Sequence, residues 1–100
     1  MPSTGEQVQD RVKTEQREPT LYKVVLLNDD YTTMEFVVEV LESVFDKSPA
    51  EAFRIMLLVH QVGRGVAGVY PWEVAETKAG RVVSLAREAG YPLQAVTEEA

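Results

Sequence analysis

The stretch at residues 28–35, Asn-Asp-Asp-Tyr-Thr-Thr-Met-Glu, joins two apolar runs through a cluster of polar side chains. Upstream, Leu21 to Leu27 is rich in β-branched and large apolar residues, which predicts a buried strand. Downstream, Thr32 and Glu35 have the spacing of a capping box, which predicts the start of a helix. Turns of this kind place short polar groups beside backbone amides, where a small charged group can be held. A purely structural alternative is that the residues at 28–30 only make the turn.

Composition limits the fold and the partners. A chain of 100 residues with 45% hydrophobic content forms one small core and has no room for a second. Its net charge of -6 and its lack of a Lys/Arg cluster argue against nucleic acid, which requires a basic surface. The absence of cysteine excludes disulfides and thiolate metal sites. Because the sequence shows no apolar run of membrane length and no secretory leader, we expect a cytoplasmic protein.

The first twenty residues differ from the rest of the chain. Residues 1–20 contain almost no large apolar residue apart from Val8 and Val12, and their charges nearly cancel. This composition predicts a disordered N-terminal extension, with Pro19 at the boundary and a core domain at 21–100. Two interpretations of this extension remain open: a flexible terminus without a function, and a flexible segment that another protein complex engages.

Periodicity and capping signals predict six elements in the order β-α-α-β-α-β. Ser48, Pro49 and Glu51 repeat the capping pattern with proline at the first helical position, and Gly63 is a suitable C-terminal cap. In the last third, Tyr70, Trp72 and Val74 alternate at period two, which favours a strand. The predicted strands cover 21–28, 64–75 and 93–97, and the predicted helices cover 33–45, 49–62 and 76–89.

Catalytic chemistry is poorly supported. The chain has a single histidine and no cysteine, and its serines lack the context of a nucleophile elbow. Asp29, Asp30 and His60 could ligate a metal, but catalytic zinc sites usually pair histidines at helical spacing. The glycines at 63–68 lie between a helix and a strand, the wrong order for a phosphate loop. We therefore expect no enzyme activity, no catalytic residue, no cofactor and no metal, and keep a metal-dependent hydrolase as a remote alternative.

A binding site uses the same residues better. If the first two helices lie side by side on the sheet, their apolar residues can wall a pocket, and methionine adapts to differently shaped guests. A carboxylate, an amide oxygen and a neutral imidazole nitrogen all accept hydrogen bonds, so together they suit an ammonium group. An apolar guest with a cation at its mouth describes the free N-terminal residue of a polypeptide. The walls would be Met34, Val37, Met56 and Val59, and the rim Asn28, Asp29 and His60. A histidine partly buried against a carbonyl is the structural alternative for His60.

Several segments together closely resemble the ClpS family. They are Leu21-Tyr22-Lys23-Val24, Asn28-Asp29-Asp30-Tyr31-Thr32, Met34-Glu35-Phe36-Val37, the helix with Met56 and Val59-His60, the run from Glu73 to Lys78, and Tyr91-Pro92-Leu93. The resemblance covers about residues 20–98, in order and at the family's spacing. ClpS proteins are bacterial adaptors that recognise N-degrons, substrates with a destabilising N-terminal residue, and hand them to the ClpA unfoldase of the ClpAP protease. The resemblance implies an α+β fold in which a three-stranded antiparallel sheet packs against three helices.

The resemblance also implies roles for single residues. Asn28, Asp29 and His60 match contacts to the substrate α-ammonium, Asp29 partly through water, while Asp30 and Thr32 match the mouth and touch the peptide backbone. Met34 matches a gatekeeper that rejects β-branched first residues, and Val37, Met56, Val59 and Leu93 match the pocket walls. Glu73 and Lys78 match positions that dock on the N-terminal domain of ClpA, which engages the extension during delivery. Thr33 stands where proline is expected; taken as the first helical position, it should loosen the gate slightly.

These roles predict an adaptor for N-terminal Leu, Phe, Tyr and Trp. Burying a Leu or Phe side chain stabilises a complex by roughly 1.5–3 kcal/mol, and a charge-assisted hydrogen bond by roughly the same amount. Association costs at least about 4 kcal/mol, so neither contribution suffices alone. Acetylating the amine, or placing Ala or Val first, should therefore abolish binding, and protonating His60 should weaken it. The alternative is a ClpA-binding interaction domain that modulates the protease without N-degron recognition.

Overall fold

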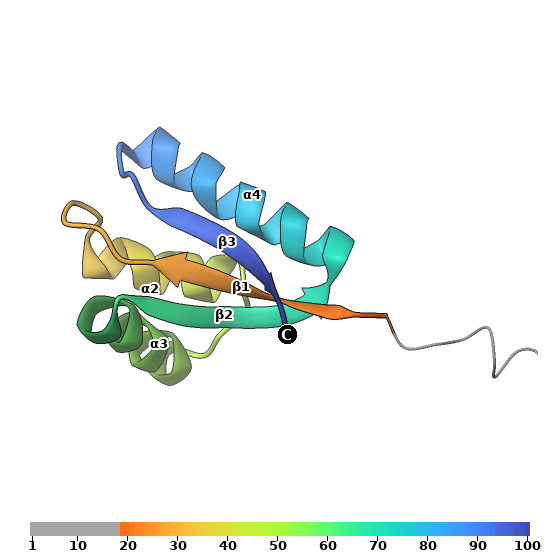
Figure 1. Cartoon of the computed structure of the whole chain (residues 1–100). Helices are drawn as coiled ribbons and strands as arrows, with labels where there is room; N and C mark the ends of the chain where they lie inside the picture. Colours follow the sequence, from red (N-terminus) through yellow and green to blue (C-terminus); the bar gives the residue numbers. More distant parts are fainter. Residues whose placement is uncertain (1–18) are drawn as a thin grey trace, which may run out of the picture.

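A computed structural model describes residues 19–100, so almost all of the predicted disordered extension lies outside the described residues. The described chain forms a three-stranded sheet and three helices in the predicted order β-α-α-β-α-β (Figure 1). The elements are β1 (Leu21–Leu27), α2 (Met34–Ser43), α3 (Pro49–Val62), β2 (Arg64–Pro71), α4 (Trp72–Ala89) and β3 (Gln94–Glu99). The α+β fold class is thereby confirmed.

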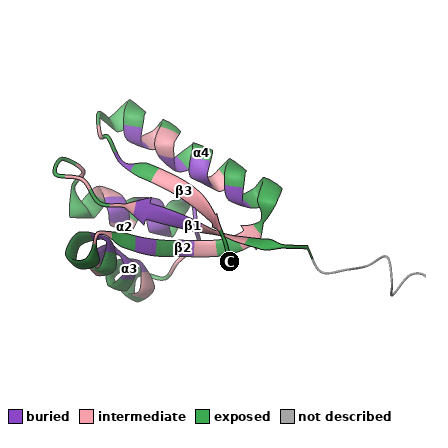
Figure 2. Cartoon of the chain, in the orientation of Figure 1, coloured by how far each residue is buried: buried purple, intermediate pink, exposed green. Residues whose placement is uncertain are grey.

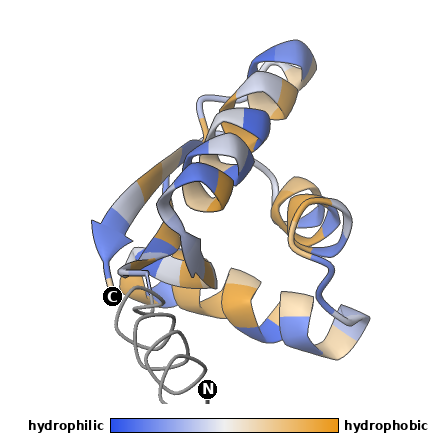
Figure 3. Cartoon of the chain, turned by 90° about the vertical axis from the view of Figure 1, so that its right-hand side faces the viewer, coloured by the Kyte–Doolittle hydropathy of each residue, from blue (hydrophilic) through white to orange (hydrophobic). Residues whose placement is uncertain are grey.

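The sheet has the order β2-β1-β3, and both outer strands run antiparallel to β1. All three helices lie on one face, as the view in Figure 3 shows from the side. Successive strand residues point to opposite faces, so Val24 and Leu26 of β1 enter the helix-covered core, where both are fully buried. Figure 2 shows this buried centre along β1 and on the inner sides of the helices.

On the other face of the sheet, an ion pair joins the two outer strands. Arg64 of β2 pairs in register with Leu27, and Glu98 of β3 pairs with Lys23. The Arg64 guanidinium contacts the Glu98 carboxylate at 2.5 Å, so the pair crosses β1 between these two positions. The predicted end of the last strand at residue 97 was therefore too early, since Glu98 and Glu99 still pair with β1.

Strand β2 contains a bulge and, close to it, a glycine that lies against helix α3. The register between β1 and β2 shifts between Val24 and Val25. At Gly65, an added Cβ would lie 2.8 Å from Val59 Cγ2 and 3.1 Å from the Ile55 carbonyl oxygen. Only glycine permits this approach, and it fixes Val59 of α3 near the end of β1.

The start of α2 differs from the predicted capping box. Thr33, and not Thr32, is the N-cap, and its hydroxyl accepts a hydrogen bond from the Phe36 amide at 3.2 Å. Thr32 is unavailable because its hydroxyl and amide both donate to Asp29. The argument from proline at the first helical position therefore does not apply to residue 33, where threonine supplies a capping oxygen that proline lacks.

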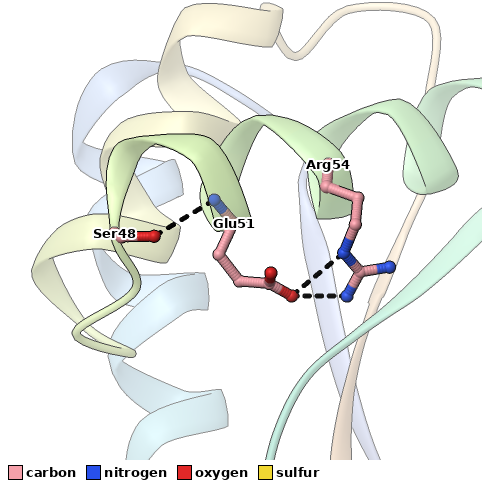
Figure 4. A network of polar contacts seen from close by, with 3 residues as sticks. All are labelled: Ser48, Glu51 and Arg54. Carbon is pink, nitrogen blue, oxygen red and sulfur yellow. Dashed lines mark hydrogen bonds and ion pairs between the residues drawn. The ribbon is translucent and has the colours of Figure 1, made fainter.

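The start of α3 has the predicted N-cap and N-terminal proline, but not the returning carboxylate of the predicted capping box. Ser48 caps the helix by accepting from the Glu51 amide at 3.2 Å, and Pro49 occupies the first position. The Glu51 carboxylate turns along the helix to Arg54, with 3.0 Å between Oε1 and Nε (Figure 4). At the other end Gly63 adopts a φ of 100° and donates its amide to the Val59 carbonyl, as expected of a C-cap glycine.

Two predicted boundaries near chain reversals were wrong. The strand predicted to reach Ala75 ends at Pro71, and α4 begins at Trp72. The aromatic alternation that favoured a strand arises instead from two contacts made in different elements. Tyr70 of β2 packs near Phe45, and Trp72 in the first helical turn meets Tyr22 edge-on at 5.0 Å. Helix α2 ends at Ser43, before the predicted residue 45, because the chain turns through a left-handed residue, Asp46.

Candidate functional site

A small cavity lies where β1 ends, α2 begins and α3 ends. Every residue predicted for the amine rim, mouth and pocket lines it except Asp30, which is exposed in the same turn. Leu27, the last residue of β1, also lines it and was missed, although its place directly before the polar turn could have indicated it. The lining residues are Leu27, Asn28, Asp29, Thr32, Met34, Val37, Met56, Val59, His60 and Leu93.

Helical spacing assembles the apolar walls. Met34 and Val37 of α2 are three residues apart, as are Met56 and Val59 of α3, so each pair lies on one face of its helix. Val37, Met56 and Val59 are buried, and Leu93, just before β3, closes the wall at 1% exposure. Met34 differs because it remains 43% exposed. It is the wall residue that can move most easily.

The polar rim is organised around Asp29. Its Oδ1 accepts hydrogen bonds from the amides of Tyr31 and Thr32 at 2.8 and 2.7 Å, and its Oδ2 accepts from the Thr32 hydroxyl at 2.7 Å. Burial alone would raise the pKa of the carboxyl. The three hydrogen bonds and the charge of Arg87 outweigh burial, so the pKa of Asp29 lies below its usual value of 3.8. The turn therefore keeps a fixed negative charge at the mouth of the cavity.

Asn28 and His60 complete the rim from two other directions. The Asn28 amide donates to the Gly63 carbonyl at 3.0 Å, which joins the end of β1 to the end of α3. Its side chain lines the cavity, as does that of His60 in the last turn of α3. His60 is exposed, so the alternative of a partly buried histidine is not supported. Its imidazole is open to a partner from solvent.

The cavity is narrow. The space open to the centre of a water molecule is about 10 Å³, close to the minimum that holds one water. A leucine or phenylalanine side chain can enter only if a wall moves. Met34 is the exposed wall residue, and its side chain has three rotatable bonds, so it is the wall residue that can be displaced most readily.

The predicted docking residues Glu73 and Lys78 lie far from this cavity. Figure 1 shows the start of α4 at the end of the sheet opposite the turn that follows β1. Glu73 is exposed in the first turn of α4. The Lys78 ammonium donates to the Val44 carbonyl at 2.6 Å and lies 5.2 Å from the ring centre of Tyr70 and 5.7 Å from that of Phe45. Lys78 thus also ties α4 to the end of α2.

Two further features are absent from residues 19–100. No group of three or more His, Asp or Glu side chains there could hold a metal ion. None of the helices in that range is long and apolar enough to cross a membrane.

Comparison with known proteins gives concordant matches. Residues 17–96 match the family described as ATP-dependent Clp protease adaptor protein ClpS. A ClpS adapter protein from Maricaulis maris is 60% identical over 83 residues, which are 83% of this chain and 76% of that protein. One from Caulobacter vibrioides is 55% identical over 95 residues, which are 95% of this chain and 87% of that protein. The solved structure of Agrobacterium tumefaciens ClpS2 bound to L-phenylalaninamide is 47% identical, with a TM-score of 0.80, and covers 83% of this chain and 100% of its own.

Proposed function

Because the chain belongs to the ClpS family of adaptor proteins for ATP-dependent Clp proteases, we propose that it binds the free N-terminal residue of substrates that begin with Leu, Phe, Tyr or Trp. Proteins of this family are adaptors and not enzymes. The similar Agrobacterium tumefaciens protein was solved with L-phenylalaninamide. That ligand has the free amine and side chain of an N-terminal phenylalanine, and its amide stands in for the next peptide bond.

One observation carries the proposal: an ionised, fixed carboxylate lies at the mouth of a cavity whose walls are apolar. Asp29 attracts the substrate ammonium, and the side-chain oxygen of Asn28 and a neutral imidazole nitrogen of His60 accept its hydrogen bonds. Thr32 and Asp30 lie in the same turn and contact the first peptide bonds. The first side chain enters between Met34, Val37, Met56, Val59 and Leu93.

Two contributions must combine for binding. Burial of a large side chain and hydrogen bonding of the ammonium each contribute roughly 1.5–3 kcal/mol, and association costs at least about 4 kcal/mol. A blocked amine or a small first residue removes one contribution. Binding is therefore selective for peptides that supply both.

The proposed destination of bound substrates is a ClpA-type unfoldase, in the cytoplasm. Glu73 and Lys78 dock on its N-terminal domain, at the opposite end of the sheet from the cavity, so substrate and unfoldase can be held together. The N-terminal extension is then available for the unfoldase to engage during delivery.

Fluorescence anisotropy with three labelled decapeptides tests substrate binding. One begins with Leu, its twin has the same sequence with an acetylated amine, and a third begins with Val. We expect only the first to bind. Equal binding of the acetylated peptide would refute the ammonium site, and binding of none of them would favour an interaction domain that docks on the unfoldase without N-degron recognition.

A further inference from the structure

A second groove adjoins the cavity on the outer side of helices α2 and α3. The space in it open to the centre of a water molecule is about 340 Å³, within the range of roughly 300–1,000 Å³ found for ligand sites. Met34 and Met56 line both the groove and the cavity, so the two share a wall. The groove is lined by Met34, Glu35, Val38, Glu39, Glu42, Phe53 and Met56.

The groove runs along α2, away from the cavity mouth. Its α2 residues lie at positions i, i+1, i+4, i+5 and i+8 counted from Met34, which is one face of a helix. From Met34 to Glu42 a helix rises about 12 Å. An extended peptide covers about 3.3–3.6 Å per residue, so three or four residues fit along this length.

The chemistry of the groove is apolar at its floor and acidic at its rim. Phe53 of α3 is 54% exposed and Val38 of α2 is half-buried, so both offer apolar surface to a partner. Three carboxylates, Glu35, Glu39 and Glu42, stand along α2, and no lysine or arginine lines the groove. Such a surface favours apolar side chains flanked by positive charges and repels acidic ones.

The connection through Met34 identifies the occupant. In the proposed complex Thr32 contacts the first peptide bonds, and Met34, the exposed wall residue, follows it two positions later in the chain. A chain that crosses Met34 enters the groove directly. Resting on the function proposed above, we propose that this groove is a subsite for about residues two to five of the substrate and selects apolar and basic side chains there.

The test compares three labelled decapeptides that all begin with Leu. Positions two to five are Lys-Phe-Lys-Lys in the first, Glu-Phe-Glu-Glu in the second and Ser-Gly-Ser-Gly in the third. Leucinamide, which lacks these positions, serves as an unlabelled competitor that reports on the cavity alone. We expect the basic peptide to bind about three- to tenfold more tightly than the Ser/Gly peptide, and the acidic peptide to bind more weakly than either.

Matched variants assign the difference to the groove. Phe53→Ala should remove most of the advantage of the Phe-containing basic peptide, while Leu58→Ala, an exposed apolar control elsewhere on α3, should not. Glu39→Lys should weaken the basic peptide about two- to fivefold and tighten the acidic one, whereas Glu88→Lys on α4 makes the same charge change without these effects. Leucinamide should compete equally well in all four variants.

The outcomes separate the groove from the cavity. If the three peptides bind wild-type protein equally and leucinamide still competes, the groove proposal is wrong and the N-terminal site stands. If the acetylated basic peptide binds as tightly as the free one, or sedimentation shows a dimer that Phe53→Ala dissociates, the groove has a different occupant and the proposal fails. If no Leu peptide binds, the proposed function fails and the subsite fails with it.

Discussion

The hydroxyl and the amide of Thr32 donate hydrogen bonds of 2.7 Å to different oxygens of Asp29, so one residue holds both sides of the carboxylate at the cavity mouth. The turn and the site are therefore the same structure. The alternative that these residues only make the turn and the hypothesis that they hold an ammonium do not exclude each other. Each Thr32 bond that fixes the turn also stabilises the charge that a substrate amine would meet.

Removing the Thr32 hydroxyl should make the free energy of unfolding less dependent on pH in the acidic range. Because the pKa of Asp29 is lowered in the folded state, the ionised carboxylate stabilises the fold above its usual pKa of 3.8 and loses this contribution as the pH falls through the lower folded pKa. Thr32→Val should reduce the free energy of unfolding by about 1 kcal/mol at pH 7. The difference should shrink as the pH falls below 3.8 and through the lower folded pKa of Asp29.

Urea unfolding at pH 7, 5 and 2.5 measures this effect. Thr32→Ser, which keeps the hydroxyl, serves as the control and should follow the wild type. A Thr32→Val deficit of equal size at pH 7 and pH 2.5 would show that the deficit does not come from the bond to the ionised Asp29 carboxylate.

Substrate affinity should depend on a hydrogen-bond acceptor at residue 60. His60 lines the cavity together with Asn28 and Asp29, and an imidazole nitrogen can accept from the substrate ammonium. His60→Ala removes this acceptor and should weaken binding of a Leu peptide about tenfold. His60→Gln, which retains an acceptor oxygen, should lose less. Anisotropy titrations of the three proteins at pH 7 measure the effect, and equal affinities would remove His60 from the acceptor set.

Substitutions of Lys78 and Glu73 should both weaken docking on the unfoldase, but only that of Lys78 should lower the stability of the fold. The Lys78 ammonium is already engaged by the Val44 carbonyl and two aromatic rings, so Lys78→Ala should lower the free energy of unfolding by about 1 kcal/mol. Glu73 is exposed, and Glu73→Ala should leave stability within about 0.5 kcal/mol. Both should weaken binding to a ClpA N-terminal domain. Thermal unfolding and calorimetric titration separate the two effects, and undiminished docking by both variants would move the unfoldase interface elsewhere.

Sequence patterns gave the element order and the cavity walls because both depend on short-range spacing. Val37, Val59 and the two methionines lie three residues apart in pairs, and that spacing is enough to put each pair on one helix face. The exact start of α2 needed more. Two adjacent threonines both fit an N-cap, and only the three-dimensional turn shows that Asp29 takes the hydroxyl of Thr32 and leaves capping to Thr33.

Other features depended on contacts between distant segments. The alternation of Tyr70, Trp72 and Val74 is compatible with a strand. The structure instead starts a helix at Trp72, whose ring packs against Tyr22, some fifty residues away along the chain. The hydrogen bond from the Lys78 ammonium to the Val44 carbonyl requires the end of α2 to lie beside α4. Residue types alone cannot reveal such contacts, since they depend on tertiary packing.

Two glycine substitutions should have opposite effects. Gly65→Ala places a methyl group 2.8 Å from Val59 Cγ2 and 3.1 Å from a backbone oxygen of α3, so it should destabilise the fold by about 1–3 kcal/mol. Because Val59 is a cavity wall, Leu-peptide affinity should also fall. Gly80→Ala in α4 meets nothing within 4 Å and should stabilise by about 0.5–1 kcal/mol. Urea unfolding of both variants tests this, and a neutral Gly65→Ala would mean that α3 can shift away from β2 at little cost.

Truncating Met34 should widen the range of accepted first residues. Its side chain is 43% exposed, so Met34→Ala should change the free energy of unfolding by less than about 1 kcal/mol. A β-branched first residue carries its bulk next to the backbone, and we expect the Met34 side chain at the cavity mouth to obstruct it. Removing that side chain should allow peptides beginning with Val or Ile to bind, while the Leu peptide weakens about fivefold through lost contact.

The comparison needs Leu, Ile and Val peptides on wild type, Met34→Ala and Met34→Leu. Met34→Leu keeps most of the side-chain volume at residue 34 and should still reject Ile and Val. It therefore shows whether Met34→Ala acts through the lost volume of the side chain or through disorder at the start of α2. If Met34→Ala rejects Ile as firmly as the wild type does, selectivity against β-branched residues must come from the buried walls. The fixed positions of Val37 and Val59 would then be the determinants to exchange, since neither can turn away as Met34 can.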